Sequence, residues 1–342
     1  MTALWTSAAI AAATGGRESA PFAVAGVTFD SREVTPGDLF VALRGAHADG
    51  HDHAAAALAN GAAGCLSERE VPGPHVRVAD TMVALRSLGA AARARTSATI
   101  VGVTGSVGKT GCKEALRSAF ARMAPDRTHA SEKSYNNHSG VPLSLARMPA
   151  EARFGVFEMG MNHSGEIQPL AAMVRPHVAL VTWVAGAHLA YLGSEEAIAA
   201  AKAEIFEGVV PGGTAIWPAD NPHAPLLRAK AEAFGLRPLS FGEGAGADVR
   251  LLSAVPGVDG TDIVADVAGE ELHFRVGMAG RHWVSNALAV VAAVHAAGGD
   301  IAEAGLALAG LTGLPGRGAR LVVPVSGGTA TILDESYNAN PA

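Results

Sequence analysis

A hydrophobic run that leads through a glycine-rich turn into an amphipathic segment constrains the fold of this chain more than any other feature. Residues 99–105 read TIVGVTG, residues 102–110 read GVTGSVGKT, and residues 113–123 place apolar side chains at intervals of three and four. The pattern predicts a strand, a loop and a helix, whose backbone N–H groups and helix N-terminus can bind phosphate. Lys109 can reach the β and γ phosphates, and Thr110 can hold Mg²⁺ through its hydroxyl.

This loop departs from the strict phosphate-loop pattern, because Val103 stands where the first glycine belongs and the glycines lie at 102 and 105. A glycine turn followed by a chance Lys-Thr pair is the alternative interpretation. The order strand, loop, helix favours a nucleotide site over that alternative. The predicted nucleotide-binding residues of the loop are Thr104, Gly105, Ser106, Val107, Gly108, Lys109 and Thr110.

Composition and charge exclude several classes of protein. The chain has 342 residues, 49% hydrophobic and 17% charged, which is enough to bury two or three separate cores. Its 26 Lys and Arg stand against 32 Asp and Glu, and we find no dense basic stripe, so nucleic acid is not an expected partner. Cys65 and Cys112 are far apart, so neither a disulfide framework nor a zinc pattern is available, and a reducing cytoplasm is expected.

The alanine-rich segments do not predict a membrane anchor. Residues 1–16 lack the basic start of a signal peptide and read instead as a short helix ended by Gly15 and Gly16. The other Ala-rich runs are broken by Arg, Glu, His or Gly, so none is long and apolar enough to span a bilayer. We therefore expect a cytoplasmic protein that does not insert into a membrane.

The pattern of strands and helices predicts three α/β regions. Residues 1–95 read as a small α/β domain, and residues 96–313 as a central domain in which strands alternate with helices, which is typical of a doubly wound, mainly parallel sheet. Between 248 and 278 strands and turns follow one another without helices, which predicts an antiparallel flap. Residues 314–342 hold one or two strands and are expected to be the start of a third domain that is cut off.

The loop TGSVGKT resembles the TG-x-x-GK[TS] loop of the Mur ligase family, which includes folylpolyglutamate synthases. Further segments similar to landmarks of that family follow in order over essentially the whole chain. They are YNNHSGVPLSL (135–145), VFEMGMNHSGEI (156–167), AGAHLAYLGS (185–194), AKAEIFEG (201–208), GRHWVSNALA (280–289), PGRG (315–318) and LDESYNANP (333–341). The resemblance implies a domain that binds a uridine diphosphate substrate, a central domain that binds ATP, and a Rossmann-like C-terminal domain that is mostly missing here.

The candidate catalytic residues are Lys109, Glu158, His188 and Lys202, and the candidate ligands of two Mg²⁺ sites are Thr110, Glu158, His188 and Lys202. Glu158 ends a hydrophobic strand, at the edge where an open α/β sheet places its ligands, and a carboxylate there can bind Mg²⁺. The resemblance implies that Glu158 and Thr110 are magnesium ligands, that His188 helps to hold a second Mg²⁺, and that Lys202 is carbamylated by CO₂ and then also binds metal. Taken alone, His188 would be an ordinary loop histidine and Lys202 a solvated helix lysine.

The resemblance also assigns ligand contacts outside the loop. It implies that Asn286 contacts adenine, that Arg317 meets the ATP phosphates, and that Asp334 contacts ribose. The segment Asp30-Ser31-Arg32 is similar to one that binds the uridine diphosphate end of the substrate. The substrate-binding candidates are Ser31, Arg32, Asn136, Asn137, Asn162 and His163, with His138 beside them. Two departures from the family pattern lie near the nucleotide: Trp283 stands where Asn is expected, and Gly111 where a hydroxyl residue often follows the Lys-Thr pair.

The resemblance implies an ATP-dependent ligase that acts, as a monomer, on UDP-N-acetylmuramoyl-tripeptide and D-alanyl-D-alanine through an acyl phosphate. The ending DESYNANP, residues 334–341, favours this dipeptide-adding member over the member that adds the third amino acid, which stays an alternative. A second alternative is a binding module, because most of the C-terminal domain is expected to be absent. A GTPase-like switch fits less well, since we find no N-K-x-D motif for guanine.

Overall fold

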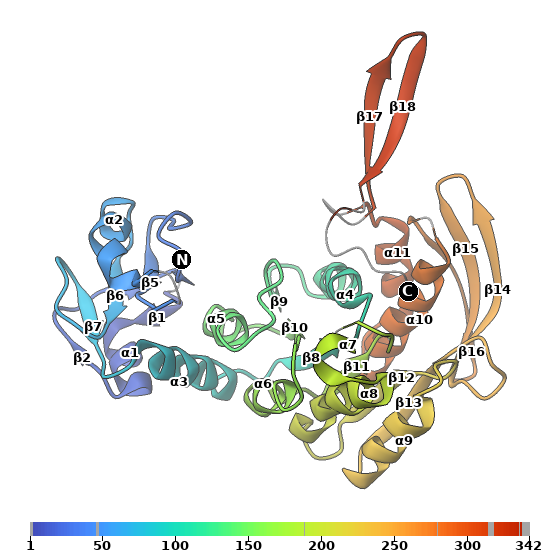
Figure 1. Cartoon of the computed structure of the whole chain (residues 1–342), viewed down its shortest axis with the longest axis horizontal. Coiled ribbons are helices and arrows are strands. Elements are labelled where there is room, and N and C mark those ends of the chain that lie inside the picture. Colours follow the sequence, from blue (N-terminus) through green and yellow to red (C-terminus); the bar gives the residue numbers. More distant parts are fainter. Residues whose placement is uncertain are drawn as a thin grey trace. The chain divides into compact units, whose positions relative to one another are not determined.

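The computed structural model describes residues 3–45, 48–187, 189–278, 280–313, 318–334 and 336 of the chain. These residues form two compact units (Figure 1). The first unit comprises Met1–Ala98 and His129–Phe157, and the second comprises Thr99–Thr128 and Glu158–Ala342. The chain therefore leaves the first unit, enters the second and returns, whereas the sequence suggested two successive domains that meet near residue 95.

The first unit is built on a five-stranded sheet with the strand order β2-β7-β6-β5-β4. Strands β4 to β7 run parallel to one another, and β2 is antiparallel to β7. The elements of this unit are β1 (Trp5–Thr6), α1 (Ser7–Thr14), β2 (Arg17–Glu18), β3 (Ala23–Val24), β4 (Gly26–Thr28), β5 (Asp38–Val41), η1 (Gly50–His53), α2 (Ala54–Ala59), β6 (Gly64–Ser67), β7 (His75–Arg77), α3 (Thr81–Ala94) and α5 (Gly140–Ala146), with all but the first residue of β9 (Thr128–Ala130) and all but the last residue of β10 (Phe154–Glu158). The short helix predicted at the N-terminus is confirmed as α1, and Gly15 ends it in the left-handed conformation.

Close helix packing explains why residues 129–157 belong to the first unit. Helix α5 packs on α3, and a Cβ atom at Gly89 would lie only 2.9 Å from the carbonyl oxygen of Pro142. Leu85 and Leu88 of α3 and Leu143 of α5 are buried in the same hydrophobic cluster. Glycine at position 89 thus lets two helices approach that are far apart in the sequence.

The second unit contains the parallel sheet that the alternation of strands and helices predicts. Strands β8, β11, β12, β13 and β14 are parallel neighbours in the order β14-β13-β12-β11-β8. Its elements are β8 (Thr99–Thr104), α4 (Lys109–Met123), α6 (Ile167–Val174), β11 (Val178–Val181), α7 (Leu189–Leu192), α8 (Glu195–Ala203), η2 (Glu204–Gly208), β12 (Thr214–Pro218), α9 (Ala224–Ala233), β13 (Arg237–Gly242), β14 (Val249–Gly257), β15 (Gly260–Val267), β16 (Glu270–Val276), α10 (Arg281–Ala296), α11 (Ile301–Ala309), β17 (Ala319–Val325) and β18 (Gly328–Asp334). The predicted α/β class with a mainly parallel central sheet is confirmed.

Helices pack together in two groups around this sheet. Helices α4, α10 and α11 contact one another, and α6 and α8 both contact η2, while α8 also contacts α9 (Figure 1). Layers of this kind bury strands on both faces, which explains why β8 and β11 are almost wholly buried. None of the described helices is long and apolar enough to cross a membrane.

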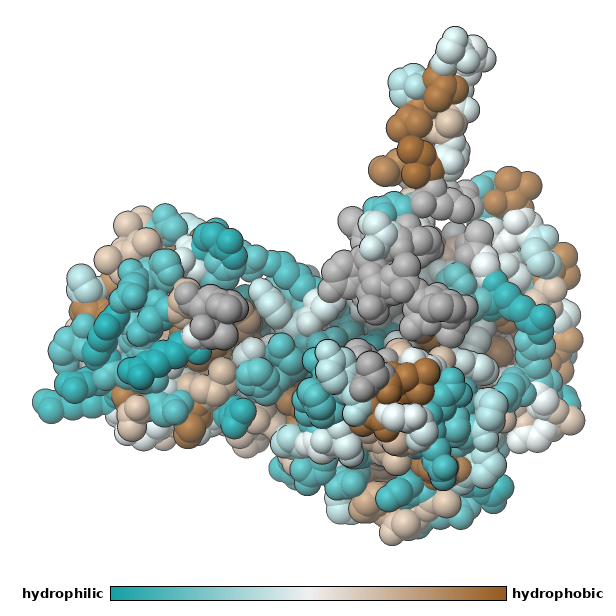
Figure 2. All heavy atoms as spheres, in the orientation of Figure 1, coloured by the Kyte–Doolittle hydropathy of each residue, from teal (hydrophilic) through white to brown (hydrophobic). Residues whose placement is uncertain are grey.

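The antiparallel flap is also confirmed, because β15 pairs antiparallel with both β14 and β16. Ala268 and Gly269 form the turn between β15 and β16, and both have positive φ angles, which suits the right-handed twist of a tight hairpin. A separate hairpin of β17 and β18 follows. Figure 2 shows apolar side chains along it, and Leu321 and Val322 are both more than half exposed. A hairpin of two strands buries little side-chain surface by itself, which accounts for that exposure.

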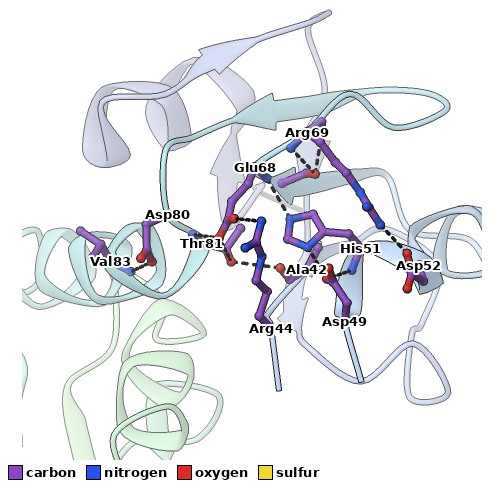
Figure 3. Close-up of polar contacts among 11 residues, drawn as sticks. Ala42, Arg44, Asp49, His51, Asp52, Glu68, Arg69, Asp80, Thr81 and Val83 are labelled. Atoms are coloured by element: carbon purple, nitrogen blue, oxygen red, sulfur yellow. Dashed lines mark hydrogen bonds and ion pairs between the residues drawn. The ribbon is translucent and has the colours of Figure 1, made fainter. Parts of the chain in front are cut away.

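A polar network anchors one loop of the first unit, as Figure 3 shows. The His51 ring is fully buried, and its Nδ1 lies 2.5 Å from the Asp49 carboxylate. Its Nε2 accepts a hydrogen bond of 3.0 Å from the backbone N–H of Glu68, so the ring proton must be on Nδ1. The Glu68 carboxylate accepts from Thr81 and pairs with Arg44. One imidazole thus ties the loop before η1 to the end of β6.

Replacing His51 with alanine should destabilise the first unit by about 2 to 3 kcal/mol, because the Glu68 N–H loses its acceptor and the buried ring leaves a cavity. Thermal unfolding measures the change. His53→Ala is the matched control, since His53 belongs to the same short helix but is exposed. Equal melting temperatures for the two variants would contradict this role of His51.

Candidate nucleotide and magnesium site

The predicted phosphate loop joins β8 to α4 in the second unit. Strand β8 ends at Thr104, and α4 begins at Lys109 directly after Gly108, whose φ angle is +83°. A Cβ atom at Gly105 would lie 2.0 Å from the Thr182 hydroxyl oxygen. Glycine is therefore required at both positions, at Gly108 by its backbone conformation and at Gly105 by the close approach of a neighbour.

The segment after β11 holds the loop in shape. The Thr182 hydroxyl donates to the Val107 carbonyl at 2.5 Å, and the Ser106 N–H donates to the Trp183 carbonyl at 2.7 Å. The Ser106 hydroxyl donates to the Ala185 carbonyl at 2.9 Å. Since β8 and β11 are parallel neighbours, their carboxyl ends meet at one edge of the sheet, where ligands bind in folds of this class. Sequence reasoning missed Thr182, although a polar residue directly after a buried strand was a usable signal.

Lys109 folds back over the loop. Its ammonium donates to the carbonyl oxygen of Gly105 at 2.7 Å and to that of Ser106 at 3.4 Å. Both acceptors are neutral, and a phosphate oxygen would form a stronger, charge-assisted hydrogen bond with the same ammonium. The side chain is therefore already at the loop, next to the N-terminus of α4, which also favours an anion.

A hydroxyl and a carboxylate meet beside Lys109. The Thr110 hydroxyl donates to the Glu158 carboxylate at 3.0 Å, and both side chains are buried. These are hard oxygen donors that suit Mg²⁺, which usually takes one or two protein ligands and completes its shell with water and phosphate oxygens. Within the residues that the structure describes, no group of three or more His, Cys, Asp or Glu gathers into a metal cluster. Thr110 and Glu158 fit a magnesium ion bound together with nucleotide phosphates.

Lys202 lies on α8 and is almost fully buried. Burial lowers the pKa of its amine well below the ordinary value of 10.5, and the positive charge of Lys109 lowers it further. A lysine in this setting spends much more of its time as a neutral amine than a surface lysine does. Only the neutral amine has the lone pair that can attack CO₂, so the lowered pKa removes one obstacle to carbamylation, which stays a prediction.

Glu204 organises the segment that carries Asn162 and His163. One carboxylate oxygen of Glu204 accepts from the Ser164 hydroxyl at 3.2 Å and from the Gly165 N–H at 2.6 Å. The other accepts from the first N–H groups of α6, at Ile167 and Gln168, at 3.1 and 3.2 Å. A carboxylate at a helix N-terminus is stabilised by those N–H groups. Sequence reasoning missed Glu204, whose only signal was its place two residues after Lys202.

Replacing Glu204 with glutamine should loosen this segment, because an amide NH₂ group then faces backbone N–H donors in place of one carboxylate oxygen. We expect hydrogen exchange of the backbone amides of Gly165, Ile167 and Gln168 to rise by about tenfold or more. Hydrogen–deuterium exchange of the peptide that spans these residues measures the change. Glu207→Gln is the matched control, since Glu207 is exposed on the same short helix. Unchanged exchange in Glu204→Gln would contradict this role.

Asn286 lies against the phosphate loop. Its side-chain oxygen would be 2.5 Å from a Cβ atom at Gly108. The Cys112 thiol lies 3.9 Å from the Asn286 carbonyl oxygen. The first two turns of α10 therefore pack on the first turn of α4, and the residue predicted to contact adenine lies beside the residues predicted to bind phosphate.

The candidate substrate residues of the first unit lie on two loops that contact each other. Glu33 forms an ion pair with Lys133, and the rings of Phe29 and Tyr135 are 5.4 Å apart. These contacts bring the segment with Ser31 and Arg32 close to the segment with Asn136 and Asn137. Arg32 itself is bound by Asp30 through two hydrogen bonds, of 2.9 and 2.6 Å, and this partner lowers the pKa of Asp30 to about 2.

Three other candidates have less structural support. His188 and Arg317 lie outside the described residues. Asp334 ends β18, where its carboxylate accepts from the Ser336 N–H at 3.1 Å and its carbonyl from the Gly318 N–H at 2.9 Å. The roles of these three residues stay predictions.

Comparison with known proteins identifies the family. The sequence model described as Mur ligase middle domain matches residues 103–294, and that described as Mur ligase family, catalytic domain, matches residues 23–79. The chain belongs to the Mur ligase family. The phosphate loop, Glu158, Lys202 and Asn286 all lie within the segment that matches the middle domain of Mur ligases, and Arg32 lies within the other.

Similar proteins cover most of the chain. The UDP-N-acetylmuramoyl-tripeptide--D-alanyl-D-alanine ligase of Escherichia coli (strain K12) is 34% identical over 95% of this chain and 71% of its own length. Crystal structure I of MurF from Acinetobacter baumannii is 32% identical, with a TM-score of 0.85 over 98% of this chain and 74% of that one. A MurF ligase from Thermotoga maritima in complex with ADP is 29% identical, with a TM-score of 0.75 over 92% of this chain and 72% of that one.

Proposed function

We propose that this chain is part of an ATP-dependent ligase that joins D-alanyl-D-alanine to UDP-N-acetylmuramoyl-tripeptide in peptidoglycan synthesis. The observation that carries the proposal is the phosphate loop in which Lys109 and the Thr110–Glu158 pair lie side by side at the edge of the sheet. The names of the relatives supply the substrates, and the ADP complex of the similar Thermotoga protein supports the binding of a nucleotide. We also propose that it is a cytoplasmic, monomeric bacterial enzyme.

The proposed reaction has two steps. An oxygen of the terminal carboxylate of the tripeptide takes the γ-phosphoryl group of ATP, so that ADP leaves and an acyl phosphate forms. The amine of D-alanyl-D-alanine then attacks the acyl carbon, phosphate leaves, and the new amide nitrogen loses a proton. The first step brings negatively charged groups together, so its main demand is charge neutralisation and alignment.

The residues of the second unit meet that demand. Lys109 would exchange its two carbonyl acceptors for phosphate oxygens, and the N–H groups at the start of α4 would bind the same anion. Thr110 and Glu158 would hold Mg²⁺, which would neutralise charge on the phosphates and the carboxylate. We propose that Lys202, as a carbamate, and His188 hold a second Mg²⁺, and that Asn286, Arg317 and Asp334 contact the rest of the ATP.

The other candidate residues would bind the UDP substrate. Ser31 and Arg32 would bind its diphosphate or uracil end, since a guanidinium offers several donors in one plane. Asn136, Asn137, Asn162 and His163 would face the sugar and the peptide. To bind a phosphate, Arg32 would have to release the Asp30 carboxylate that holds it now, or bind the carboxylate and the phosphate together. Because the chain spans 71 to 74% of the length of the relatives compared, we propose that it binds ATP and the UDP substrate but ligates poorly alone.

Calorimetry tests the proposal with the 342-residue chain. The proposal expects binding of UDP-N-acetylmuramoyl-tripeptide and, separately, of the ATP analogue AMP-PNP with Mg²⁺. Phosphate release that depends on D-alanyl-D-alanine, in a protein extended to the length of the relatives, tests ligation. Release that depends instead on a dipeptide precursor and a diamino acid would assign the protein to the ligases that add the third amino acid. A chain that bound AMP-PNP but not the UDP substrate would disprove the proposed substrate.

A further inference from the structure

The two departures from the Mur ligase pattern contact each other. Gly111 is in the first turn of α4, and Trp283 is in the first turn of α10. A Cβ atom at Gly111 would lie 3.0, 3.4 and 3.7 Å from Cη2, Cζ2 and Cζ3 of the Trp283 indole. The ring therefore occupies the space that the side chain of a larger residue at position 111 would take.

Neighbouring residues of α10 lie close to the phosphate loop and to the ring. Asn286, about one turn further along α10, packs on Gly108. The ring of His282 lies 6.0 Å from that of Trp283, tilted by 46°. Trp283 is only partly buried, and its ring lies against Gly111 in the first turn of α4, which also holds Lys109 and Thr110.

We propose that Gly111 and Trp283 form a coupled pair whose function is to place an indole against the base of the bound nucleotide. An asparagine at 283 could bind a base only through hydrogen bonds at its edge, whereas an indole offers a π surface on which a purine ring can stack. The absence of a side chain at 111 is what makes room for that ring. The inference rests on the proposed nucleotide site and adds to it, beside Asn286, a residue that stacks on the base.

Two ligands separate contact with the base from contact with the phosphates. AMP-PNP carries base, ribose and phosphates, and inorganic tripolyphosphate carries the phosphates alone. Replacing Trp283 with leucine keeps an apolar side chain but removes the π surface, so the affinity for AMP-PNP with Mg²⁺ should fall by about fivefold or more. The affinity for tripolyphosphate should stay within about twofold of that of the unchanged protein, because the loop itself is intact. Trp283→Phe keeps an aromatic ring and should lose less than Trp283→Leu.

Coupling is tested by a second substitution. Gly111→Ser should displace the ring and weaken AMP-PNP binding by about as much as Trp283→Leu does. The double variant should bind no more weakly than either single variant, because the same contact is lost only once. Gly246→Ser is the matched control, since a Cβ atom at Gly246 meets nothing within 4 Å. It should leave both affinities unchanged.

The outcomes separate this inference from the function on which it rests. Equal loss of AMP-PNP and tripolyphosphate affinity in Trp283→Leu, or no loss of either, would show that the ring only fills space and would overturn the inference. Additive losses in the double variant would overturn the coupling. If Trp283→Leu does not fold, Trp283→Phe and Gly111→Ser still decide between these results. Failure of the unchanged chain to bind both ligands would instead overturn the proposed nucleotide site, and the inference with it.

Discussion

Replacing Lys109 with alanine should weaken binding of AMP-PNP with Mg²⁺ by about 100-fold, as expected when a hydrogen-bonded charge partner of a phosphate is lost. In the structure the Lys109 ammonium is held by two neutral carbonyl oxygens, of Gly105 and Ser106. A nucleotide phosphate offers the same ammonium charged acceptors, so binding exchanges weaker hydrogen bonds for stronger ones. Alanine removes that gain and leaves the backbone of the loop in place. Calorimetric titration of the two proteins measures the difference.

Two further variants show whether a loss of affinity is specific to the Lys109 ammonium. Arg117 lies two turns further along α4 and pairs with Glu114 at the surface, so Arg117→Ala removes a cation of the same helix and should leave the affinity unchanged. Lys109→Arg keeps the charge, but a guanidinium is bulkier than an ammonium, so we expect only partial affinity. Equal affinities of Lys109→Ala and the unchanged chain would mean that phosphate does not bind at this loop.

The sequence predicts the loop well because its determinants are local. Gly105 and Gly108, Lys109 and Thr110, and the strand and helix on either side all lie within one short stretch. The parallel sheet and the flap could be predicted for a similar reason, since alternation of strands and helices and turn residues such as Gly269 are read from neighbouring positions.

The parts that sequence reasoning did not find depend on contacts between distant segments. The Thr182 hydroxyl donates to the Val107 carbonyl oxygen, and the Glu204 carboxylate accepts mainly from backbone N–H groups. Backbone partners leave no pattern of residue types, so the one usable signal is the position of Thr182 after a buried strand. Gly111 and Trp283 were visible as two separate departures, but their contact depends on the packing of α4 against α10. Residues 129–157 join the first unit because α5 packs on α3, which no local pattern specifies.

Lys202→Met should raise the stability of the chain at pH 7 by about 1 to 2 kcal/mol in buffer free of CO₂. In the folded chain burial lowers the pKa of the Lys202 amine, and in the unfolded chain that pKa returns to its ordinary value of 10.5. Between the lowered and the ordinary pKa the unfolded chain therefore binds one more proton, so the free energy of unfolding rises with pH in that window. Methionine removes this dependence, and thermal unfolding between pH 7 and 10 measures it. A lower melting temperature for the variant would contradict the prediction.

Substitutions at position 202 also test whether Lys202 is carbamylated. Addition of ¹³C-bicarbonate should give a carbamate signal in the ¹³C NMR spectrum of the unchanged chain, and none in Lys202→Met or Lys202→Arg, because a guanidinium stays protonated and does not attack CO₂. With AMP-PNP bound, both variants should also need about tenfold more Mg²⁺ for saturation, since each lacks the anionic ligand. A variant that is more stable than the natural chain and yet binds Mg²⁺ more weakly would mark Lys202 as a residue kept for its chemistry at the expense of stability. Equal Mg²⁺ affinity in all three proteins would assign this lysine no part in binding metal.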